Sequence, residues 1–247
     1  MDLHLEGRTA VVCGASAGIG LGVAEALAEE GANVVMFARN PERLEREAER
    51  LGGVAVPGDV TSADDLERLV RTAVDAFGGI DILLNNSGGP PRTPAVGLDA
   101  EQIETAVRLL LVSVVRLTGL CLPYLERSEC GRIVNITSST VKEPTDYLAL
   151  SNAVRPGVIG WAKSMSRELG HKGITVNSIA PGRIDTERLR EVYPDGPTED
   201  DLHTIPLRRL GTPREIGDVV AFLCSDRAAY VTGTVLAVDG GLVRGLL

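Results

Sequence analysis

The chain has 247 residues, of which 44% are hydrophobic and 24% charged, so it is long enough for one globular domain with a sizeable core. Its formal net charge of −9 disfavours nucleic acids and anionic membranes as partners, because both require basic surfaces. The four cysteines show no CxxC spacing and the three histidines are scattered, which predicts reduced thiols in a cytoplasmic protein without a metal site. The apolar stretch 109–125 is interrupted by Arg116 and is too short to span a bilayer comfortably, so we expect a buried helix there.

Short apolar runs alternate with helical patterns along the whole chain. Strands are expected in TAVVCG (from Thr9), NVVMFA, VAVPGDV, DILLNNSG, GRIVNITSS, GITVNSIAPG and VLAVDGG. Helices are expected at 18–31, 41–53, 62–79, about 100–126, about 151–170 and from Thr212 onward. Because the strand runs are continuously apolar, they are buried on both faces. The sequence therefore predicts a single α/β domain over 1–247, a doubly wound (Rossmann) parallel sheet with helices on both faces.

The segment CGASAGIG (13–20) follows the first strand and opens the first helix. Glycines in this loop allow a tight turn and a close ligand, and the helix N-terminus offers free N–H groups to a phosphate. The loop residues predicted to bind a dinucleotide are Gly14, Ser16, Gly18, Ile19 and Gly20.

Two other interpretations of the loop compete with this one. The letters 14–18 also spell G-x-S-x-G, the nucleophile elbow of α/β-hydrolases. An elbow normally follows several strands and needs a histidine near a strand end, and neither condition is met here. A tight turn without a ligand is the other alternative.

The end of the second predicted strand favours NADP(H) over NAD(H). An NAD site places an acidic residue here to bind the ribose hydroxyls, but this chain has Ala38. Arg39 follows and can bind a 2′-phosphate. Alternatively, Arg39 is a solvated charge at the start of a helix.

The chain resembles the short-chain dehydrogenase/reductases, and most closely their 3-oxoacyl-carrier-protein-reductase-like branch. The matching motifs are CGASAGIG, GDV (58–60), NNSG (85–88), NITSS (135–139), the run 180–186 and VTGTVLAVDGG (231–241). The resemblance implies adenine contacts at Asp59 and Val60 and a ribose floor at Asn86, Ser87 and Gly88. It implies nicotinamide and phosphate contacts at Pro181, Gly182, Ile184 and Thr186. It also implies a homodimer or homotetramer formed through the long fourth and fifth helices.

The family uses an Asn–Ser–Tyr–Lys catalytic group, and only its serine is present here, as Ser138. Leu110, Ser151 and Arg155 stand at the asparagine, tyrosine and lysine positions. A serine hydroxyl is a far weaker acid than a phenol, whereas an arginine could still hold the ribose hydroxyls. The stretch YLALSNAVR resembles a divergent branch of the family that also lacks the usual tetrad.

Two nearby residues complicate this part of the site. Pro156 removes a helix hydrogen bond, so the helix is expected to begin only there, which would displace Ser151 and Arg155 from the family positions. Tyr147 is a candidate replacement phenol, with Arg155 as its electrostatic partner. The alternative is that Tyr147 lines the substrate pocket or packs as a lid.

The motifs expected to bind the cofactor are largely present, whereas the catalytic group is altered. Three alternative functions are consistent with this combination. The first is an NADP(H)-dependent oxidoreductase acting on a carbonyl compound or alcohol, with Ser138, Tyr147, Ser151 and Arg155 as catalytic residues. The second is a non-redox cyclase, dehydratase or isomerase, and the third a non-catalytic NADP-binding subunit. The segment 187–209, which contains Pro194, Pro197 and Pro206, is expected to form a lid and substrate wall.

Overall fold

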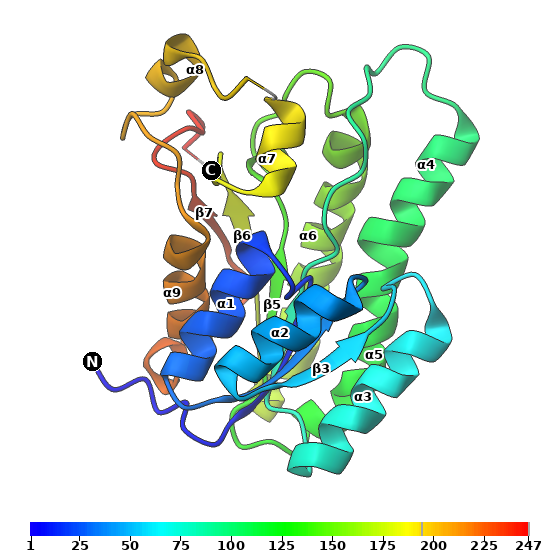
Figure 1. Ribbon diagram of the computed structural model, residues 1–247, viewed down its shortest axis with the longest axis vertical. Helices are drawn as coiled ribbons and strands as arrows, with labels where there is room; N and C mark the ends of the chain where they lie inside the picture. Colours follow the sequence, from blue (N-terminus) through cyan, green and yellow to red (C-terminus); the bar gives the residue numbers. More distant parts are fainter. Residues whose placement is uncertain (194, 247) are drawn as a thin grey trace.

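The computed structural model, which describes residues 1–193 and 195–246, is built around one seven-stranded parallel sheet (Figure 1). Pro194 of the predicted lid lies outside the described residues. The strands are β1 (Thr9–Cys13), β2 (Asn33–Ala38), β3 (Val54–Pro57), β4 (Ile82–Asn85), β5 (Arg132–Ile136), β6 (Thr175–Pro181) and β7 (Val235–Val238). Their order in the sheet is β3-β2-β1-β4-β5-β6-β7, so the order reverses between β1 and β4. Ligands of doubly wound sheets bind at this reversal, outside the carboxyl ends of the strands.

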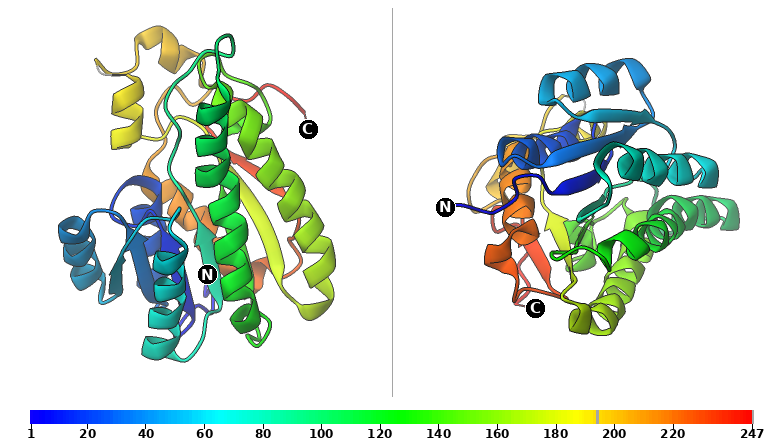
Figure 2. Two further views of the ribbon diagram at one scale, coloured as in Figure 1. Left: turned by 90° about the vertical axis from the view of Figure 1, so that its right-hand side faces the viewer. Right: turned by 90° about the horizontal axis from the view of Figure 1, so that it is seen from below.

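Helices cover both faces of the sheet (Figure 2). The long helices are α1 (Gly18–Glu29), α2 (Pro41–Leu51), α3 (Ala63–Phe77), α4 (Ala100–Val107), α5 (Ser113–Leu125), α6 (Ala149–Leu169) and α9 (Pro213–Cys224). One buried cluster joins the sheet to α1, α2 and α9, and the other joins it to α3, α5 and α6. The short helices α7 (Glu187–Val192) and α8 (Glu199–His203) lie beyond the carboxyl ends of the strands. The predicted doubly wound fold is confirmed.

The helix predicted near 100–126 is continuous from Ala100 to Leu125, with a π-helical turn at Arg108–Val112 between α4 and α5. The expectation that this stretch is too short for a membrane span was wrong. At 26 residues and a mean hydropathy of 1.8, it is the one helix among the described residues that could span a membrane by length and composition. Its α5 part packs against α3 and its α4 part against α6, and 39% of its most apolar window is buried inside the structure.

Helix α6 runs through Pro156 without a break, so the prediction that the helix begins at Pro156 was wrong. An internal proline costs a helix about 3 kcal/mol. On the same helix, Leu150, Val154, Val158 and Ala162 are all buried. Each large apolar side chain gains about 1.5–3 kcal/mol on burial, so packing outweighs the cost of the proline. As a result, Ser151 and Arg155 lie one helical turn apart and are both buried.

Candidate active site

The loop between β1 and α1 has the geometry that its glycines predict. Gly14 and Gly18 have φ values of 65° and 54°, in the left-handed region that favours glycine. A Cβ atom on Gly20 would lie 2.2 Å from the carbonyl oxygen of Gly14, and one on Gly14 would lie 2.6 Å from Nδ2 of Asn86. The loop therefore folds back on itself and packs against the end of β4, where no side chain fits.

The N-terminus of α1 has the donors that a phosphate group requires. Its N-cap residue, Ala17, makes no side-chain capping bond, whereas Asn40, Ser62, Asp99, Thr186 and Thr212 cap other helices. The first N–H groups of α1 are thus left for a ligand, and they lie at the positive end of the helix dipole. The loop residues Ser16 and Ile19 are half-buried beside them. These residues fit the pyrophosphate of a dinucleotide.

The end of β2 offers a cationic side chain to a ligand. Arg39 is exposed directly after β2 and has no hydrogen-bond or ion-pair partner within 1–193 and 195–246. On the neighbouring strand end, the backbone N–H of Asp59 donates to Asp65 Oδ2 at 3.0 Å. The backbone N–H of Asp65 in turn donates to Oγ of Ser62, the N-cap residue of α3, at 3.3 Å.

Arg155 lies beneath the central strand ends. Its Nη2 donates to the carbonyl oxygen of Gly88 at 2.6 Å, and its Nη1 to that of Ile136 at 3.1 Å. Burial lowers the pKa of its guanidinium to about 10, with the nearby charge of Arg188 acting in the same direction, so Arg155 stays cationic at neutral pH. Its Nε is buried and has no partner in the described structure. Arg155 therefore fastens the segment 86–88, the predicted ribose floor, to the end of β5.

Ser138 and Ser151, both predicted catalytic residues, are linked only through Thr140. The hydroxyl of Ser138 accepts a hydrogen bond from the Thr140 backbone N–H at 3.2 Å, and the Thr140 and Ser151 hydroxyl oxygens are 3.2 Å apart. Ser138 and Thr140 line a cavity, but Ser151 is 5% exposed and does not. Sequence reasoning missed Thr140, although it lies only two residues after Ser138. Leu110 is fully buried against Leu150 and cannot supply the polar group of the family asparagine.

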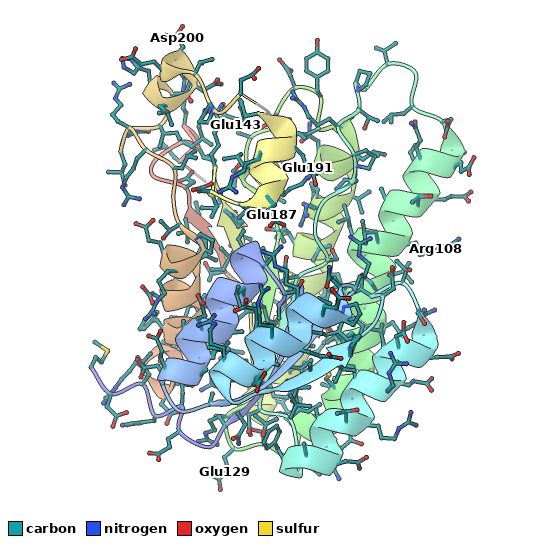
Figure 3. All side chains as sticks on the ribbon, viewed as in Figure 1. Arg108, Glu129, Glu143, Glu187, Glu191 and Asp200 are labelled. Carbon is teal, nitrogen blue, oxygen red and sulfur yellow. The ribbon has the colours of Figure 1, made fainter. Side chains whose placement is uncertain are left out.

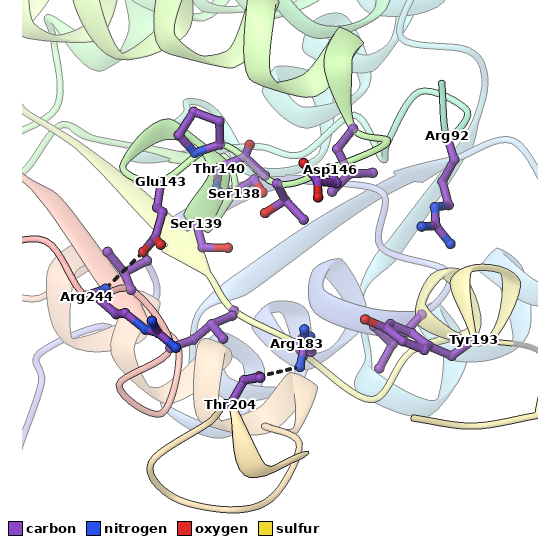
Figure 4. Close-up of a pocket in the computed structure, with 17 residues that line it drawn as sticks. Arg92, Ser138, Ser139, Thr140, Glu143, Asp146, Arg183, Tyr193, Thr204 and Arg244 are labelled. Atoms are coloured by element: carbon purple, nitrogen blue, oxygen red, sulfur yellow. Dashed lines mark hydrogen bonds between the residues drawn. The ribbon is translucent and has the colours of Figure 1, made fainter. Parts of the chain in front are cut away.

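The cavity has a volume of about 490 Å³ and lies at the carboxyl edge of the sheet (Figure 4). Its lining comes from the loops after β4 and β5, the turn after β6, the segment 187–209 and the C-terminal residues 242–244. From the predicted lid, Leu189, Tyr193 and Thr204 face the cavity, which suits a substrate wall. Tyr193 is the one phenol among the described lining residues.

Tyr147, the candidate replacement phenol, lies on the loop whose residues Asp146 and Leu148 line the cavity, but its own side chain does not line it. Its side chain is 61% exposed, its ring lies under the Arg92 guanidinium at 5.7 Å, and it is not among the residues that line the cavity. Thr93 forms a backbone bridge to this loop, in which its N–H donates to the Tyr147 carbonyl oxygen at 2.9 Å. The bridge holds Tyr147 in a left-handed conformation, with φ of 59°. The geometry therefore gives no support to a catalytic Tyr147.

The turn after β6 completes the cofactor half of the site. Pro181 ends the strand, and a Cβ on Gly182 would lie 2.6 Å from Cα of Asp239, so this turn is tightly packed. Ile184 is buried, and Thr186 caps α7 with its hydroxyl. A Cβ on Gly18 would lie 3.2 Å from Thr186 Cγ2, which shows that the β6 turn and the glycine loop meet. The two segments that the sequence assigns to one cofactor are thus adjacent.

Comparison with known proteins agrees with this geometry. Residues 14–243 match a family model described as enoyl-(acyl carrier protein) reductase. The 3-oxoacyl-[acyl-carrier-protein] reductase FabG of Vibrio cholerae is 38% identical over 97% of this chain and 99% of its own. FabG of Thermotoga maritima is 35% identical over 98% of this chain and 100% of its own.

Solved structures show the same relationship. L-sorbose reductase of Gluconobacter frateurii, complexed with NADPH and L-sorbose, superposes with a TM-score of 0.90 at 30% identity over 100% of both chains. An NADPH-bound short-chain oxidoreductase of Pseudomonas aeruginosa PAO1, described as containing an atypical catalytic center, has a TM-score of 0.91 at 32% identity over 96% of this chain and 97% of that one. These matches favour the dinucleotide interpretation of the glycine loop over the hydrolase one. The chain belongs to the short-chain dehydrogenase/reductase family of oxidoreductases.

Proposed function

We propose that the protein is an NADP(H)-dependent oxidoreductase that interconverts a small carbonyl compound and its alcohol. The observation that carries the proposal is the glycine loop, whose uncapped helix end opens at the same sheet edge as the Ser138 cavity. When bound, the nicotinamide ring would give a hydride to the carbonyl carbon or accept one from the alcohol carbon. The residues that would hold the cofactor are Gly14, Ser16, Gly18, Ile19, Gly20, Arg39, Asp59, Val60, Asn86, Ser87, Gly88, Pro181, Gly182, Ile184 and Thr186.

The preference for NADP(H) rests on Arg39 and on the relatives. Arg39 is exposed, has no partner within the described residues and follows the strand end where an NAD site would carry an acid. Two of the solved relatives were determined with NADPH. The exposed guanidinium is therefore available for the 2′-phosphate that distinguishes NADP(H) from NAD(H).

Reduction of a carbonyl also requires a proton on its oxygen. The Ser138 hydroxyl accepts from Thr140, which leaves its own proton free to hydrogen-bond a substrate oxygen. We assign the proton donor to Tyr193, because a phenol is the kind of acid the missing family tyrosine supplied. The Tyr193 ring lies 5.8 Å from the Arg183 guanidinium, and its hydroxyl donates to Asp201 Oδ1 at 3.4 Å, a long contact that a substrate oxygen would have to replace. Ser151 and Arg155 would then position Thr140 and Gly88 rather than touch the substrate.

The test is a deuterium-transfer assay with NADPH deuterated at C4 of the nicotinamide ring and a panel of small ketones and aldehydes. The proposal expects an alcohol carrying one deuterium on the former carbonyl carbon, with one NADP⁺ formed per alcohol. A product of unchanged oxidation state formed without NADPH would instead identify the non-redox cyclase, dehydratase or isomerase. In that case the oxidoreductase proposal fails.

A non-catalytic NADP-binding subunit is the second candidate, and one observation favours it. Ser151 and Arg155, the replacements for the catalytic tyrosine and lysine, both make their contacts within the protein. Nucleotide binding without turnover of any tested carbonyl compound would support this candidate. Turnover that Tyr193→Phe abolishes would exclude it.

We also infer a cytoplasmic homodimer or homotetramer. The helix over 100–125 leaves Ile103, Val112 and Val115 between 38% and 41% exposed, and such apolar side chains are commonly covered by a second subunit. Light scattering coupled to size exclusion tests this inference. A monomer at micromolar concentration would contradict it.

A further inference from the structure

The cavity beside Ser138 is richer in positive charge than the molecule as a whole. Three arginines from three separate segments line it: Arg92 after β4, Arg183 after β6 and Arg244 near the C-terminus. Two carboxylates, of Glu143 and Asp146, also line it. The whole chain carries a net charge of −9, and acidic residues such as Glu191 and Asp200 mark the outer surface around the lid (Figure 3). The arginines are therefore a local feature of the cavity and not part of a basic face.

Of these three arginines, Arg183 is the one that the fold holds most firmly. Its side chain is only 21% exposed, and it directly follows Gly182 at the end of β6. Its Nη1 donates to the Asp201 carbonyl oxygen and, at 2.8 Å, to the hydroxyl of Thr204. Figure 4 shows its guanidinium between Tyr193 and Thr204, across the cavity from Ser138 and Ser139. A guanidinium held this way loses little conformational freedom when it binds a ligand.

The contacts of Arg183 leave donors unused. A guanidinium has five N–H groups, and the hydrogen bonds made within the described residues involve Nη1 alone. Nη2 forms an ion pair with Asp201 Oδ1 at 3.8 Å, which is longer than a hydrogen bond. The hydrogen bonds that the Asp201 carboxylate accepts come from other groups: the Thr198 hydroxyl at 2.7 Å and backbone N–H at 3.0 Å on Oδ2, and the Tyr193 hydroxyl at 3.4 Å on Oδ1. Nε and Nη2 of Arg183 thus lack a hydrogen-bonded anion.

Among the described residues, neither of the two carboxylates that line the cavity is hydrogen-bonded to Nε or Nη2 of Arg183. Glu143 Oε2 accepts from the backbone N–H of Arg244 at 3.0 Å, which directs it toward the C-terminal segment. Asp146 lies on the loop before α6, and its side chain has no hydrogen bond or ion pair in the described part of the chain. A partly buried cation with open donors, facing a cavity, is a binding site for an anion.

We propose that Arg183 binds the carboxylate of the substrate, so that the protein acts on a small oxo acid whose carbonyl group meets Ser138. This inference rests on the proposed oxidoreductase function and adds the substrate class to it. The guanidinium fork pairs with a carboxylate through two parallel hydrogen bonds, which also orients the substrate. The cavity volume of about 490 Å³ suits a small ligand of this kind. Arg183 is thus a specificity-determining residue, Tyr193 lies beside it, and Ser138 meets the substrate from across the cavity.

The experiment compares charged and neutral forms of the same molecule in binding, without turnover. Acetoacetate, levulinate and the methyl ester of each are titrated by calorimetry into protein saturated with NADP⁺, which cannot reduce them. For wild type we expect at least one acid to bind about tenfold more tightly than its ester. Arg183→Gln should weaken that acid about tenfold or more and leave the ester within about twofold.

Two further variants separate anion binding from a structural role. Arg190→Gln is the matched control, because Arg190 is an exposed arginine of the same segment that pairs with Asp185 at 3.2 Å and does not line the cavity. It should change neither affinity. Arg183→Lys keeps the charge without the fork, so it should recover part of the affinity for the acid. This variant also keeps the test valid if Arg183→Gln fails to fold.

Acid and ester that bind equally well to wild type would overturn the proposal. Equal weakening of both by Arg183→Gln would also overturn it, because that result would show that Arg183 only tethers α8. Absence of binding by every probe to NADP⁺-saturated protein counts against it as well. The failure of the proposed function is distinct, because it would show as an absence of NADP⁺ binding before any oxo acid is added.

Discussion

The glycine loop and the start of helix α6 both lie at the carboxyl ends of the strands, but they are held by different kinds of contact. The loop is defined by backbone geometry, in which Gly14, Gly18 and Gly20 leave no room for side chains. Helix α6 carries the positions where the family places its tyrosine and lysine, and there side chains decide what chemistry is possible. Ser151 and Arg155 make their contacts with the protein itself.

This difference shows which half of an active site tolerates change. A ligand site made of backbone groups, such as the glycine loop, keeps its ligand as long as its glycines and the start of its helix are retained. The surrounding sequence can then change. Side-chain chemistry can instead move to another segment that faces the same cavity. In the proposed mechanism the lid supplies Tyr193, and Arg155 of α6 supports the segment 86–88.

The largest expected effect is that of Tyr193→Phe. The substitution keeps the ring beneath Arg183 but removes the proposed acid, so kcat should fall about 10²- to 10⁴-fold while NADPH affinity stays unchanged. Steady-state kinetics with an active carbonyl substrate measures it. Tyr147→Phe is the matched control and should change kcat by less than about twofold, because Tyr147 is exposed outside the cavity. The opposite pattern would assign the proton donor to Tyr147.

The second effect concerns the glycine loop. In Gly20→Ala, the added Cβ would lie 2.2 Å from the Gly14 carbonyl oxygen, so the loop must shift. Such overpacking costs about 3 kcal/mol, and we expect NADPH affinity to fall by about two orders of magnitude. Fluorescence titration measures the affinity. Gly79→Ala, at a glycine with nothing within 4 Å of its added Cβ, should bind NADPH like wild type. Unchanged NADPH binding by Gly20→Ala would show that the glycine loop does not hold the cofactor.

The third effect tests the support given by α6. Arg155→Met removes two hydrogen bonds and leaves the carbonyl oxygens of Gly88 and Ile136 without these donors. We expect the free energy of unfolding, measured in urea, to fall by about 2 kcal/mol. Arg155→Lys retains a charge but cannot reach both oxygens in the same way, so it should give a smaller loss. Full stability of both variants would show that Arg155 does not fasten the strand ends.

The fourth effect concerns the choice of nucleotide. Arg39→Ala should weaken NADPH binding about tenfold and leave NADH binding unchanged, because only NADPH carries the 2′-phosphate. Arg43→Ala is the control, since Arg43 already pairs with Glu187 at 2.7 Å. Equal losses for NADPH and NADH would show that Arg39 acts on something other than the 2′-phosphate.

The smallest effect is pH-dependent and lies outside the site, at the start of α9. The Arg209 guanidinium and then the Thr212 backbone N–H lower the pKa of Glu215 from its usual 4.5 to about 2. A lowered carboxyl pKa stabilises the folded state above about pH 4.5, and the gain is lost as the pH falls toward 2. The Glu215 side chain is 41% exposed, so solvent screening keeps the effect small. Glu215→Gln should cost about 1 kcal/mol at neutral pH, and the difference from wild type should shrink in acid. A difference independent of pH would contradict this linkage.

Much of the fold could be predicted because its signals are local. The run NVVMFA is β2 residue for residue, and Gly52 and Gly78 end α2 and α3 in the left-handed conformation that favours glycine. The glycine loop could also be predicted from the sequence, since its function depends on the absence of side chains. Continuity of α6 through Pro156 was not predictable, because it depends on the burial of Leu150 and Val154 against α4.

The catalytic side of the cavity was harder to predict for the same reason. Tyr147 is four residues from Ser151 in sequence, but the bridge to Thr93 places it on the outside. Tyr193 lines the cavity because the lid lies beyond the carboxyl ends of the strands, and Arg183 does so because it follows the end of β6. No local sequence pattern encodes either placement. Thr140 could have been noticed from its position two residues after Ser138, where a 3₁₀ turn brings it toward α6.

The most direct test of the central claim is a titration of the purified protein with NADPH and with NADH, followed by nicotinamide fluorescence. We expect micromolar NADPH binding and NADH binding at least about tenfold weaker, because the glycine loop has the geometry of a phosphate site and Arg39 is available for the 2′-phosphate. Absence of binding by both nucleotides would contradict this expectation. The glycine loop would then be inherited architecture without a ligand, and the oxidoreductase proposal would fail.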